Sequence, residues 1–522
     1  MVGTFLPSHP LGDASINPQN PKSVSNNGEL LVDTYGGMVH VEWDPNAAVT
    51  SLGQLPFFIE FLKLGGLFDS WVETCPLDMT SRNAPSTVNV LGTLLLSILS
   101  GHRRYAHVTS IRCDGVNPGL LGMTKIVSED SLRRGLSKIE QEAGIRWLQN
   151  SFYKCYAPLM TQPWIMDVDT TVKVLYGHQE SAVVGYNPKK PGRPSHTYHT
   201  YFMANLRLVL DVEVQAGNQM AATFTAPNMW KVLEGIPKSQ WPAFLRGDNG
   251  FGTDGVMTAA EEKGLPYLFK LRQTKNVSKE IKNLMLSDGW ADAGQGWEGK
   301  GSSLKLHGWK KWRRVIVLRK RILPPDSSPA STLPDCAQHK LLSIPGVVEK
   351  GGDYEYAVLI TSLEDGIMTI AQHYRDRGDC ENTLDELKNQ WGWGGYTTQD
   401  LHRCSLVARA VGLIYNWWNL YTRLANPDKH LEAVTSRPLL LHAMARQTTH
   451  AGQTHLRVTS AHGKSGYVRE FLGYLRHFFD SLKNCAEQLT AEQRWYRILS
   501  KALEKYLKGI ILEPPLALPD TG

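Results

Sequence analysis

The spacing of apolar residues changes along the chain and predicts where its elements lie. From about residue 52 to residue 149 they recur every three or four positions, as in FFIEFLKLGGLFDSWV and VNVLGTLLLSIL, which predicts helices. Short β-branched and aromatic runs follow, and PWIMDVDTTVKVLYG, YFMANLRLVLDVEVQAG, PAFLRGD and LPYLFKLR predict strands. Strand and helix alternate again at YEYAVLITSL and TIAQHYRDRGDCENTLDELKNQW. The pattern therefore predicts an α/β core that follows a helical region.

One segment interrupts this pattern. It holds four tryptophans, the basic run WKKWRRVIVLRKRIL and the loop PPDSSPASTLPD, so a β-rich insertion is the simplest interpretation. After Trp393 the pattern is largely helical to about Leu507. The expected parts are a loose segment at 1–45, a helical region at 46–158, a core at 159–276 and 353–425, the insertion at 277–352, and a helical region at 426–522.

Composition and charge narrow the class of protein. Hydrophobic residues make up 42% and charged residues 20%, as in ordered globular chains. No secretory signal is evident, and the longest apolar stretch, VNVLGTLLLSILSG, is too short to cross a membrane, so a soluble intracellular protein is expected. The net charge of +6 suits an anionic partner without identifying one. Residues 300–321 contain nine Lys or Arg and no acid, which fits either such a partner or a solvated strand face.

The segment HYRDRGDCENTLDELK predicts a helix with an acidic residue at the border of its buried face. At about 100° per residue, four polar residues form one stripe. They are Tyr374, Arg377, Glu381 and Lys388. The adjoining apolar face consists of Cys380, Leu384, Leu387 and Trp391. A carboxylate flanked by cations is thereby expected at the edge of the core.

The spacing of this stripe, Y-(2)-R-(3)-E-(6)-K, resembles the signature of a large group of bacterial insertion-sequence DDE transposases. The resemblance implies two upstream aspartates on strands. They are matched by Asp169 in IMDVDTTV and Asp248 in FLRGDNGFG, and VLITS resembles the strand before the signature helix. The fragments GHRRYAH, SEDSLRR and GYNPKKPGRPS resemble the thirteen-eighty branch of the insertion-sequence-four superfamily. The likeness spans about residues 103–395.

This resemblance implies an α/β fold with an RNase H-like catalytic core, a β-rich insertion and helical N- and C-terminal regions. Asp169, Asp248 and Glu381 would be the catalytic triad and would bind two Mg²⁺ or Mn²⁺ ions, for which carboxylates supply hard oxygen ligands. The implied activity cuts transposon ends and joins their 3′-hydroxyls to target DNA. The implied partners are terminal inverted repeats, target duplex and a second copy of the chain, in the nucleoid of a bacterial cytoplasm.

Two further carboxylates are alternative members of the expected triad. Asp167 shares a strand face with Asp169, so periodicity does not separate them, although the D-T-T context favours Asp169. Asp385 lies near Glu381 on the helical wheel and is the alternative third acid.

Several basic residues are expected to contact DNA. Arg377 and Lys388 are predicted phosphate contacts and Tyr374 a hydroxyl donor, with salt bridges to Glu381 and Asp385 as the alternative. The proline-flanked loop at 186–199 adds three cations, which are Lys189, Lys190 and Arg193. The helix that Ser128 is predicted to cap adds Arg133 and Arg134. A solvated loop and an ordinary helical bundle are the competing interpretations.

The insertion offers an aromatic contact. Trp309 and Trp312 lie among cations that include Arg313 and Arg314, a composition that suits an unstacked nucleotide. Related transposases with this signature hold a flipped base on a tryptophan of the insertion. The alternative is that the rings fill a small core. Rings three apart on a strand face opposite ways, so at most one reaches DNA, and Trp312 is favoured.

Two other functions compete with transposition. An RNase H-like nuclease would need the triad without strand transfer, and a domesticated DNA-binding protein would need no catalysis. The intact triad argues against the second.

Overall fold

The computed structural model describes residues 30–514 apart from 80, 82, 188, 323–353, 428, 461–462 and 486–487. The opening stretch predicted to be loose and the Pro/Ser-rich loop of the insertion fall largely or wholly outside these residues. Two compact units are present, residues 1–48 and residues 49–522. The first contains a hairpin of β1 (Leu30–Thr34) and β2 (Gly37–Val41).

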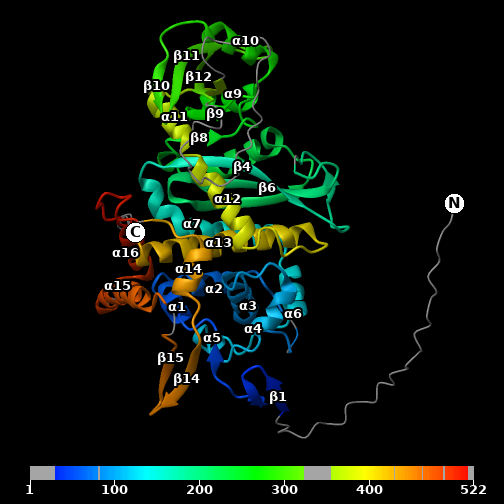
Figure 1. Ribbon diagram of the computed structural model, residues 1–522, viewed down its shortest axis with the longest axis vertical. Coiled ribbons are helices and arrows are strands. Elements are labelled where there is room, and N and C mark those ends of the chain that lie inside the picture. Colours follow the sequence, from blue (N-terminus) through cyan, green and yellow to red (C-terminus); the bar gives the residue numbers. More distant parts are fainter. Residues whose placement is uncertain are drawn as a thin grey trace, which may run out of the picture. The chain divides into compact units, whose positions relative to one another are not determined.

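Helices fill the first part of the second unit, as the sequence predicts (Figure 1). They are α1 (Leu55–Leu64), α2 (Leu67–Glu73), α3 (Thr87–Leu99), α4 (Val108–Ile111), α5 (Asn117–Leu120), α6 (Glu129–Ser137) and α7 (Gln141–Tyr156). The predicted cap is confirmed, because the Ser128 hydroxyl accepts a hydrogen bond from the Ser131 amide at 3.2 Å. The run after Ser128 forms two helices, since Glu140 caps a new one through the Ala143 amide at 2.8 Å.

A large mixed sheet forms the centre of this unit. Its strands run in the order β10-β11-β12-β13-β9-β8-β4-β6-β5, with β7 also paired to β6. Their bounds are β4 (Ile165–Val174), β5 (Val183–Val184), β6 (Pro194–Met203), β7 (Leu208–Ala216), β8 (Phe244–Gly247), β9 (Tyr267–Lys270), β10 (Ala291–Gly294), β11 (Trp297–Leu304), β12 (Arg313–Arg321) and β13 (Tyr354–Thr361). The β4–β8 and β8–β9 pairs are parallel, whereas β6 is antiparallel to both β4 and β7.

The strands of the expected insertion do not form a sheet of their own. β13 pairs with β12 on one side and with β9 on the other, both antiparallel, so β10, β11 and β12 extend the core sheet. Helices α8 (Ala226–Glu234), α9 (Asp254–Lys263) and α10 (Lys275–Met285) connect the strands from β7 to β10. The strands predicted for the described part of the insertion, residues 277–322, are therefore present, and their hydrogen bonding is continuous with the core.

The long helix α13 (Leu401–Ala425) packs against β7 and α7 (Figure 1). Asn416 bonds both backbone groups of Val209, at 2.8 Å and 2.7 Å, and the Arg409 guanidinium lies 2.8 Å from the buried Asp211 carboxylate. These polar contacts fix the position of the helix along the strand, which apolar packing alone would leave less defined.

The predicted signature helix consists of two pieces. α11 (Ile367–Arg375) and α12 (Gly378–Gln390) are joined by a tight turn, in which the Cys380 amide bonds the Arg377 carbonyl at 2.9 Å. The expected buried face is confirmed, because Cys380, Leu384, Leu387 and Trp391 are all buried. The rotation of α12 about its axis therefore agrees with the sequence pattern.

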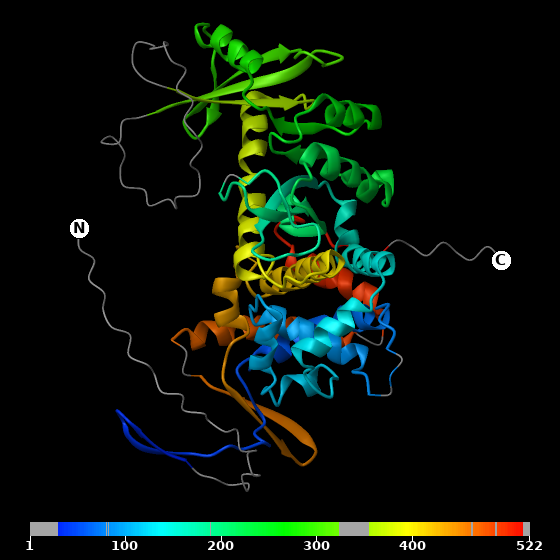
Figure 2. The same cartoon turned by 90° about the vertical axis from the view of Figure 1, so that its right-hand side faces the viewer.

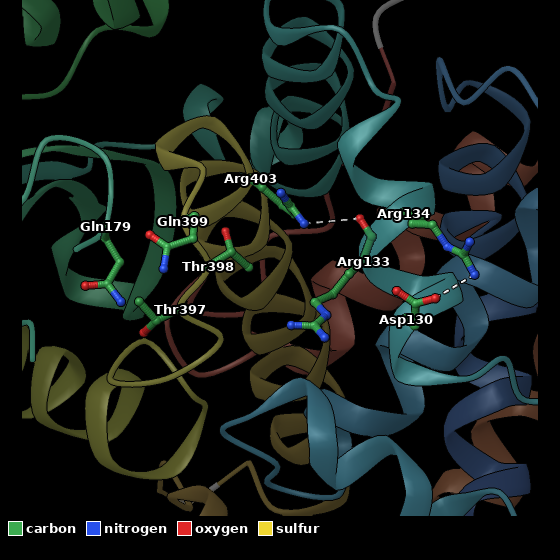
Figure 3. Close-up of a pocket in the computed structure, with 8 residues that line it drawn as sticks. All are labelled: Asp130, Arg133, Arg134, Gln179, Thr397, Thr398, Gln399 and Arg403. Atoms are coloured by element: carbon green, nitrogen blue, oxygen red, sulfur yellow. Dashed lines mark hydrogen bonds and ion pairs between the residues drawn. The ribbon is translucent and has the colours of Figure 1, made fainter. Parts of the chain in front are cut away.

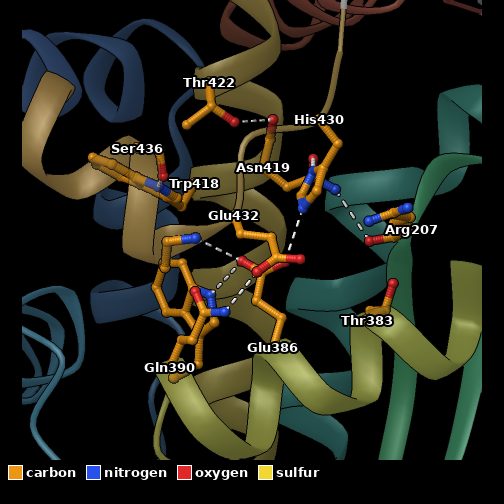
Figure 4. A network of polar contacts seen from close by, with 12 residues as sticks. Arg207, Thr383, Glu386, Gln390, Trp418, Asn419, Thr422, His430, Glu432 and Ser436 are labelled. Carbon is orange, nitrogen blue, oxygen red and sulfur yellow. Dashed lines mark hydrogen bonds and ion pairs between the residues drawn. The ribbon is translucent and has the colours of Figure 1, made fainter. Parts of the chain in front are cut away.

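A buried polar network ties α12 to the helices that follow it (Figure 4). The carboxylate of Glu386 accepts hydrogen bonds from the Trp391 indole at 3.0 Å and the Ala433 amide at 3.0 Å, and lies 2.8 Å from the His430 ring. Each partner is fixed by its own helix or loop. The network therefore sets the direction in which the other side chains of α12 point.

The C-terminal part is less helical than its pattern predicts. It contains α14 (Ala433–Leu440), α15 (Ser465–Asn484) and α16 (Ala491–Ala502), but also a hairpin of β14 (Ala445–His450) and β15 (Gln453–Val458). β14 pairs with the short strand β3 (Val49–Thr50). Within the described residues, no helix combines the length and the apolar character that crossing a bilayer requires.

Candidate active site

Asp169 and Asp248 lie beside each other on neighbouring parallel strands. The pairing of β4 with β8 ends at Val168 opposite Gly247, so the next step of the register brings Asp169 level with Asp248. Residues at one level of a parallel pair point to the same face, and neighbouring strands are about 4.8 Å apart. The two carboxylates therefore project from one edge of the central strands.

Local hydrogen bonds hold both side chains. Asp169 Oδ1 accepts from the Thr170 amide at 2.7 Å, and Asp248 Oδ1 accepts from the Gly250 amide at 2.9 Å. Glycine at 247 is a packing requirement, because a Cβ there would lie 2.8 Å from the Phe251 ring. The R-G-D-N-G sequence thus forms a tight turn that presents Asp248 at the end of β8.

Arg377 joins the third acid to this pair. Its buried guanidinium donates to Asp169 Oδ2 at 2.6 Å through one terminal nitrogen and to Glu381 through the other. Only 5% of the Arg377 surface is exposed, whereas 63% of the Glu381 side chain is. The tight turn between α11 and α12 places Arg377 between the strand edge and the helix, so Glu381 lies at the solvent side of the site.

The electrostatics of the site favour an added positive charge. Burial raises the pKa of Asp169 to about 6, the Arg377 charge opposes this rise, and the nearby Asp248 and Glu381 carboxylates add to it. One arginine therefore compensates only part of the repulsion among three acids. Such a perturbed carboxylate at the edge of a core is a common property of functional sites.

The donor chemistry fits divalent metal ions of the hard, oxygen-binding kind. Asp169, Asp248 and Glu381 offer carboxylate oxygens alone, which is the ligand type that Mg²⁺ and Mn²⁺ prefer. In the described part of the chain, however, no three His, Cys, Asp or Glu side chains are arranged to hold a metal ion. The guanidinium of Arg377 bonds oxygens of both Asp169 and Glu381.

The structure separates the two alternative acids from the triad. Asp167 is fully buried and forms a two-pronged ion pair with Arg246, with nitrogen to oxygen distances of 2.6 Å and 2.7 Å. Arg246 also donates to the His373 carbonyl, so Asp167 serves to hold α11 on the sheet. Asp385 is exposed and accepts a hydrogen bond from Asn389 at 2.7 Å.

The other two residues of the signature stripe border the same site. Lys388 donates to the Thr171 hydroxyl at 2.9 Å, two residues along β4 from Asp169. Burial raises the pKa of Tyr374, and the nearby negative charges of Asp248, Glu381 and Asp169 raise it further. The four signature residues therefore cluster around the middle of β4, although no ion pair between Lys388 and Asp385 is formed in the described structure.

Sequence analysis missed Lys173, which lies on the same face of β4. Its amine is buried, donates to the Gly395 carbonyl at 2.5 Å and lines a cavity of about 150 Å³ with Thr171 and Lys388. Burial lowers its pKa to about 8. The period of two from Asp169 through Thr171 to Lys173 was the available signal.

The proline-flanked loop lies toward Lys388. Lys189, Lys190 and Arg193 are exposed, and the last two lie 5.2 Å and 5.6 Å from the centre of the Tyr176 ring. Burial lowers the pKa of Lys388, and the charge of Lys189 lowers it further, so the loop and α12 are close. A basic surface therefore continues outward from the cavity.

Arg133 and Arg134 line a separate pocket of about 350 Å³ (Figure 3). Each forms an ion pair on its own helix, Arg133 with Glu129 at 2.9 Å and Arg134 with Asp130 at 2.6 Å. The remaining lining residues are Asp130, Gln179, Thr397, Thr398, Gln399 and Arg403. The pairing reduces, without cancelling, the excess of positive charge in this pocket.

Trp309 and Trp312 lie in the loop between β11 and β12, so the alternation of a strand does not explain their directions. Trp309 is buried with 9% of its surface exposed, whereas Trp312 is 66% exposed. Arg313 is buried and bonded to Asp254 and Glu261, and Arg314 donates to the carbonyls of Leu363 and Asp365. Both guanidinium groups therefore bind within the protein, which argues against the predicted contacts of Arg313 and Arg314 with DNA.

Comparison with known proteins identifies the family. A family model described as transposase DDE domain group 1 matches residues 77–479, and the chain therefore belongs to this family of DDE transposases. Among solved structures it is similar to the cryo-EM structure of a piggyBac transposase synaptic complex with hairpin DNA. That likeness has 10% sequence identity and a TM-score of 0.36, and covers 91% of this chain and 87% of that chain. No curated protein matches the chain.

Proposed function

We propose that this transposase cuts transposon ends and joins the freed 3′-hydroxyls to target DNA by phosphoryl transfer that depends on two metal ions. One observation carries the proposal, namely that Asp169 and Asp248 each directly follow the last β4–β8 pair, Val168 with Gly247, while Arg377 links Asp169 to Glu381. The order β7-β6-β4-β8-β9, with its antiparallel and then parallel pairs, supports an RNase H-like core.

In this proposal the triad holds Mg²⁺ or Mn²⁺. Bound ions of this type polarise phosphoryl oxygens and lower the pKa of water. Arg377 keeps Asp169 and Glu381 near each other and compensates part of their charge. Lys388, backed by Thr171, and the hydroxyl of Tyr374 would contact the DNA backbone beside the scissile bond. Water replaces the 3′-oxygen at phosphorus in the first reaction. In the second, the freed hydroxyl attacks a target phosphorus and displaces the target strand's own 3′-oxygen.

The finer assignments are also proposals. The Y-(2)-R-(3)-E-(6)-K spacing supports membership of the insertion-sequence-four superfamily, its thirteen-eighty branch, and hence a bacterial host. Five cations remain proposed DNA contacts, since each lies at a pocket or in an exposed loop. They are Lys189, Lys190, Arg193, Arg133 and Arg134. A homodimer on DNA follows from the need to process two ends together. Sizing the protein with end DNA should give two chains for two ends.

The test uses the full chain and duplex DNA from both flanks of its gene, with Mg²⁺ or with EDTA. Asp169→Asn, Asp248→Asn and Glu381→Gln should each abolish cleavage and keep DNA binding, because an amide preserves shape but weakens metal coordination. Near-normal cleavage by any of the three would show that its residue is wrongly assigned. Joined products distinguish a transposase from a nuclease, which would yield cut ends alone.

A further inference from the structure

The hairpin β14–β15 carries an unusual concentration of positive and neutral polar residues. Between Glu432 and Glu470 the chain has four arginines, one lysine, four histidines and no acid. Blocks of one charge sign are commonly interaction surfaces for the opposite sign. The proposed chemistry uses none of these residues.

The pairing of the two strands sorts these residues onto one face. Across the hairpin Arg446 is opposite Arg457, Thr448 is opposite His455, and His450 is opposite Gln453. The other face pairs Ala445 with Val458, Gln447 with Leu456 and Thr449 with Thr454, and carries no charge. We call the first set the basic face. Alternation along the strands thus gives the hairpin a charged side and a neutral side.

The basic face is open to solvent. The side chains of Arg446, His450, His455 and Arg457 are all exposed. At its base the hairpin is fixed by the buried Ala445 and by β3, which pairs with Ala445 and Arg446, and from Gln447 onward it projects from the helices of this unit (Figures 1 and 2). In the described part of the chain neither arginine side chain has a hydrogen bond or an ion pair. Both are therefore available to a partner.

The two opposed arginines destabilise the free hairpin, and an anionic partner would relieve their repulsion. Like charges directly opposite each other on a strand pair are destabilising, by a few tenths to about 1 kcal/mol. A two-stranded ribbon outside a core is itself only marginally stable in water. The direct opposition of Arg446 and Arg457 is therefore better explained by binding than by folding.

The shape of the ribbon selects among nucleic acids. The major groove of B-DNA is about 12 Å wide and admits a two-stranded ribbon, whereas the minor groove is about 6 Å wide and does not. Surfaces for single strands rely on aromatic rings that stack on bases. The segment ARQTTHAGQTHLRV contains no Phe, Tyr or Trp. Duplex DNA is thus the partner that fits both the charge and the form.

We propose that the hairpin β14–β15 enters the major groove of duplex DNA and that Arg446 and Arg457 contact its phosphates or guanine edges. This inference rests on the proposed function in that DNA is the substrate. It assigns a DNA-binding role to a segment well separated in sequence from the triad. The same contact would serve an end sequence or a target sequence, and the two are separated experimentally.

The test measures binding of the full chain to labelled duplexes of about 30 base pairs over a range of salt concentrations. One duplex comes from the flank of the gene, one has random sequence, and the single strand is a third probe. Arg446→Gln/Arg457→Gln should weaken duplex binding roughly tenfold or more. It should also reduce the slope of log affinity against log salt by about 0.9 for each phosphate that an arginine no longer neutralises. Weaker binding to both duplexes indicates phosphate contacts, and a greater effect on the flank duplex indicates base readout at the ends.

Matched variants separate charge from folding. Arg446→Lys/Arg457→Lys keeps the charge and should keep the salt slope, and Thr449→Ala/Thr454→Ala alters only the neutral face and should bind as wild type. The glutamine variant should unfold at the same temperature as wild type or higher, because repulsion is relieved. Distamycin, a minor-groove ligand, should leave the hairpin-dependent part of binding intact.

Three results would overturn the inference. The first is wild-type affinity and salt slope for the glutamine variant on both duplexes, and the second is displacement of the hairpin from DNA by distamycin. The third is an equal weakening of binding to the single strand, which would exclude groove binding. Failure of the proposed function looks different, since the wild-type chain would then bind duplex DNA through the hairpin and yet show no metal-dependent cleavage.

Discussion

The guanidinium of Arg377 lies 2.6 Å from the carboxylate of Asp169, and both groups are largely buried. The same guanidinium binds Glu381, so a single cation connects acids from the central sheet and from α12. A buried charge left without its partner is strongly destabilising. Arg377 is therefore a positioning residue, whose influence on the reaction passes through the two carboxylates that it holds.

Replacing Arg377 by Gln should destabilise the protein by about 3–5 kcal/mol in EDTA, because Asp169 then faces Asp248 and Glu381 without a counter-charge. Mg²⁺ should restore part of that stability, since an ion that binds only the folded state stabilises it. Thermal unfolding with and without Mg²⁺ measures both effects. The matched control is Arg375→Gln on α11, for which Mg²⁺ should cause no additional rise. Equal responses of the two variants to Mg²⁺ would contradict this account.

Asp167→Asn should affect folding more than Asp169→Asn does. The first change leaves the buried Arg246 without its anionic partner, and breaking a buried pair typically costs about 3–5 kcal/mol. The second removes a carboxylate that is already repelled by its neighbours. Urea unfolding in EDTA should rank Asp167→Asn as the less stable variant. The reverse ranking would mean that the Asp167–Arg246 pair is not structural.

Comparison of Trp312→Ala with Trp309→Ala should distinguish a ring that contacts DNA from a ring that packs inside the protein. Trp309 is buried beneath the Arg313 guanidinium, which lies 5.4 Å from its ring centre, so its removal should cost about 3–5 kcal/mol. Trp312 is exposed, and its removal should leave the unfolding temperature nearly unchanged while slowing second-strand cleavage after normal nicking. Unimpaired second-strand cleavage by Trp312→Ala would remove this ring from the mechanism.

The free energy of unfolding should fall in mild acid, because the ring of His199 binds a proton more readily in the unfolded chain. Burial lowers the pKa of this fully buried ring from the ordinary 6.5 to about 4, so the folded state favours the neutral form. The contribution is complete above about pH 6.5 and is lost as the pH falls toward 4, by on the order of 2 kcal/mol between about pH 8 and pH 5. His199→Gln should be less stable at pH 8 and lose less on acidification. Parallel losses in both proteins would place the acid sensitivity elsewhere.

Much of the candidate site follows from sequence, because strand and helix periodicities describe short-range geometry. The wheel that places Glu381 beside Arg377 and next to a buried face agrees with α12. Periodicity does not distinguish Asp167 from Asp169, since both share a strand face. Their difference lies in which arginine reaches each, and Arg246 and Arg377 come from other elements.

Other features depend on interactions between distant segments and left weak local signals. The strand pairing of β14 with β3 joins residues at opposite ends of the chain, and the Thr-, His- and Gln-rich segment has little apolar periodicity. Trp309 is buried and Trp312 is exposed, and strand alternation does not explain this difference because both residues lie in a loop. The loop leads into Arg313, which the carboxylates of α9 bind. Lys173 was missed because no charge partner marks it in the sequence.

The pairing of β13 with both β9 and β12 also bears on the order in which the proposed site is completed as the chain is synthesised. Asp169 and Asp248 emerge from the ribosome before the insertion, whereas Glu381 follows β13 and can reach them only after that strand has joined the sheet. Domains fold as the chain is made, from the N-terminal side onward. A nascent chain whose insertion is unfinished therefore carries two of its three proposed acids and lacks the third.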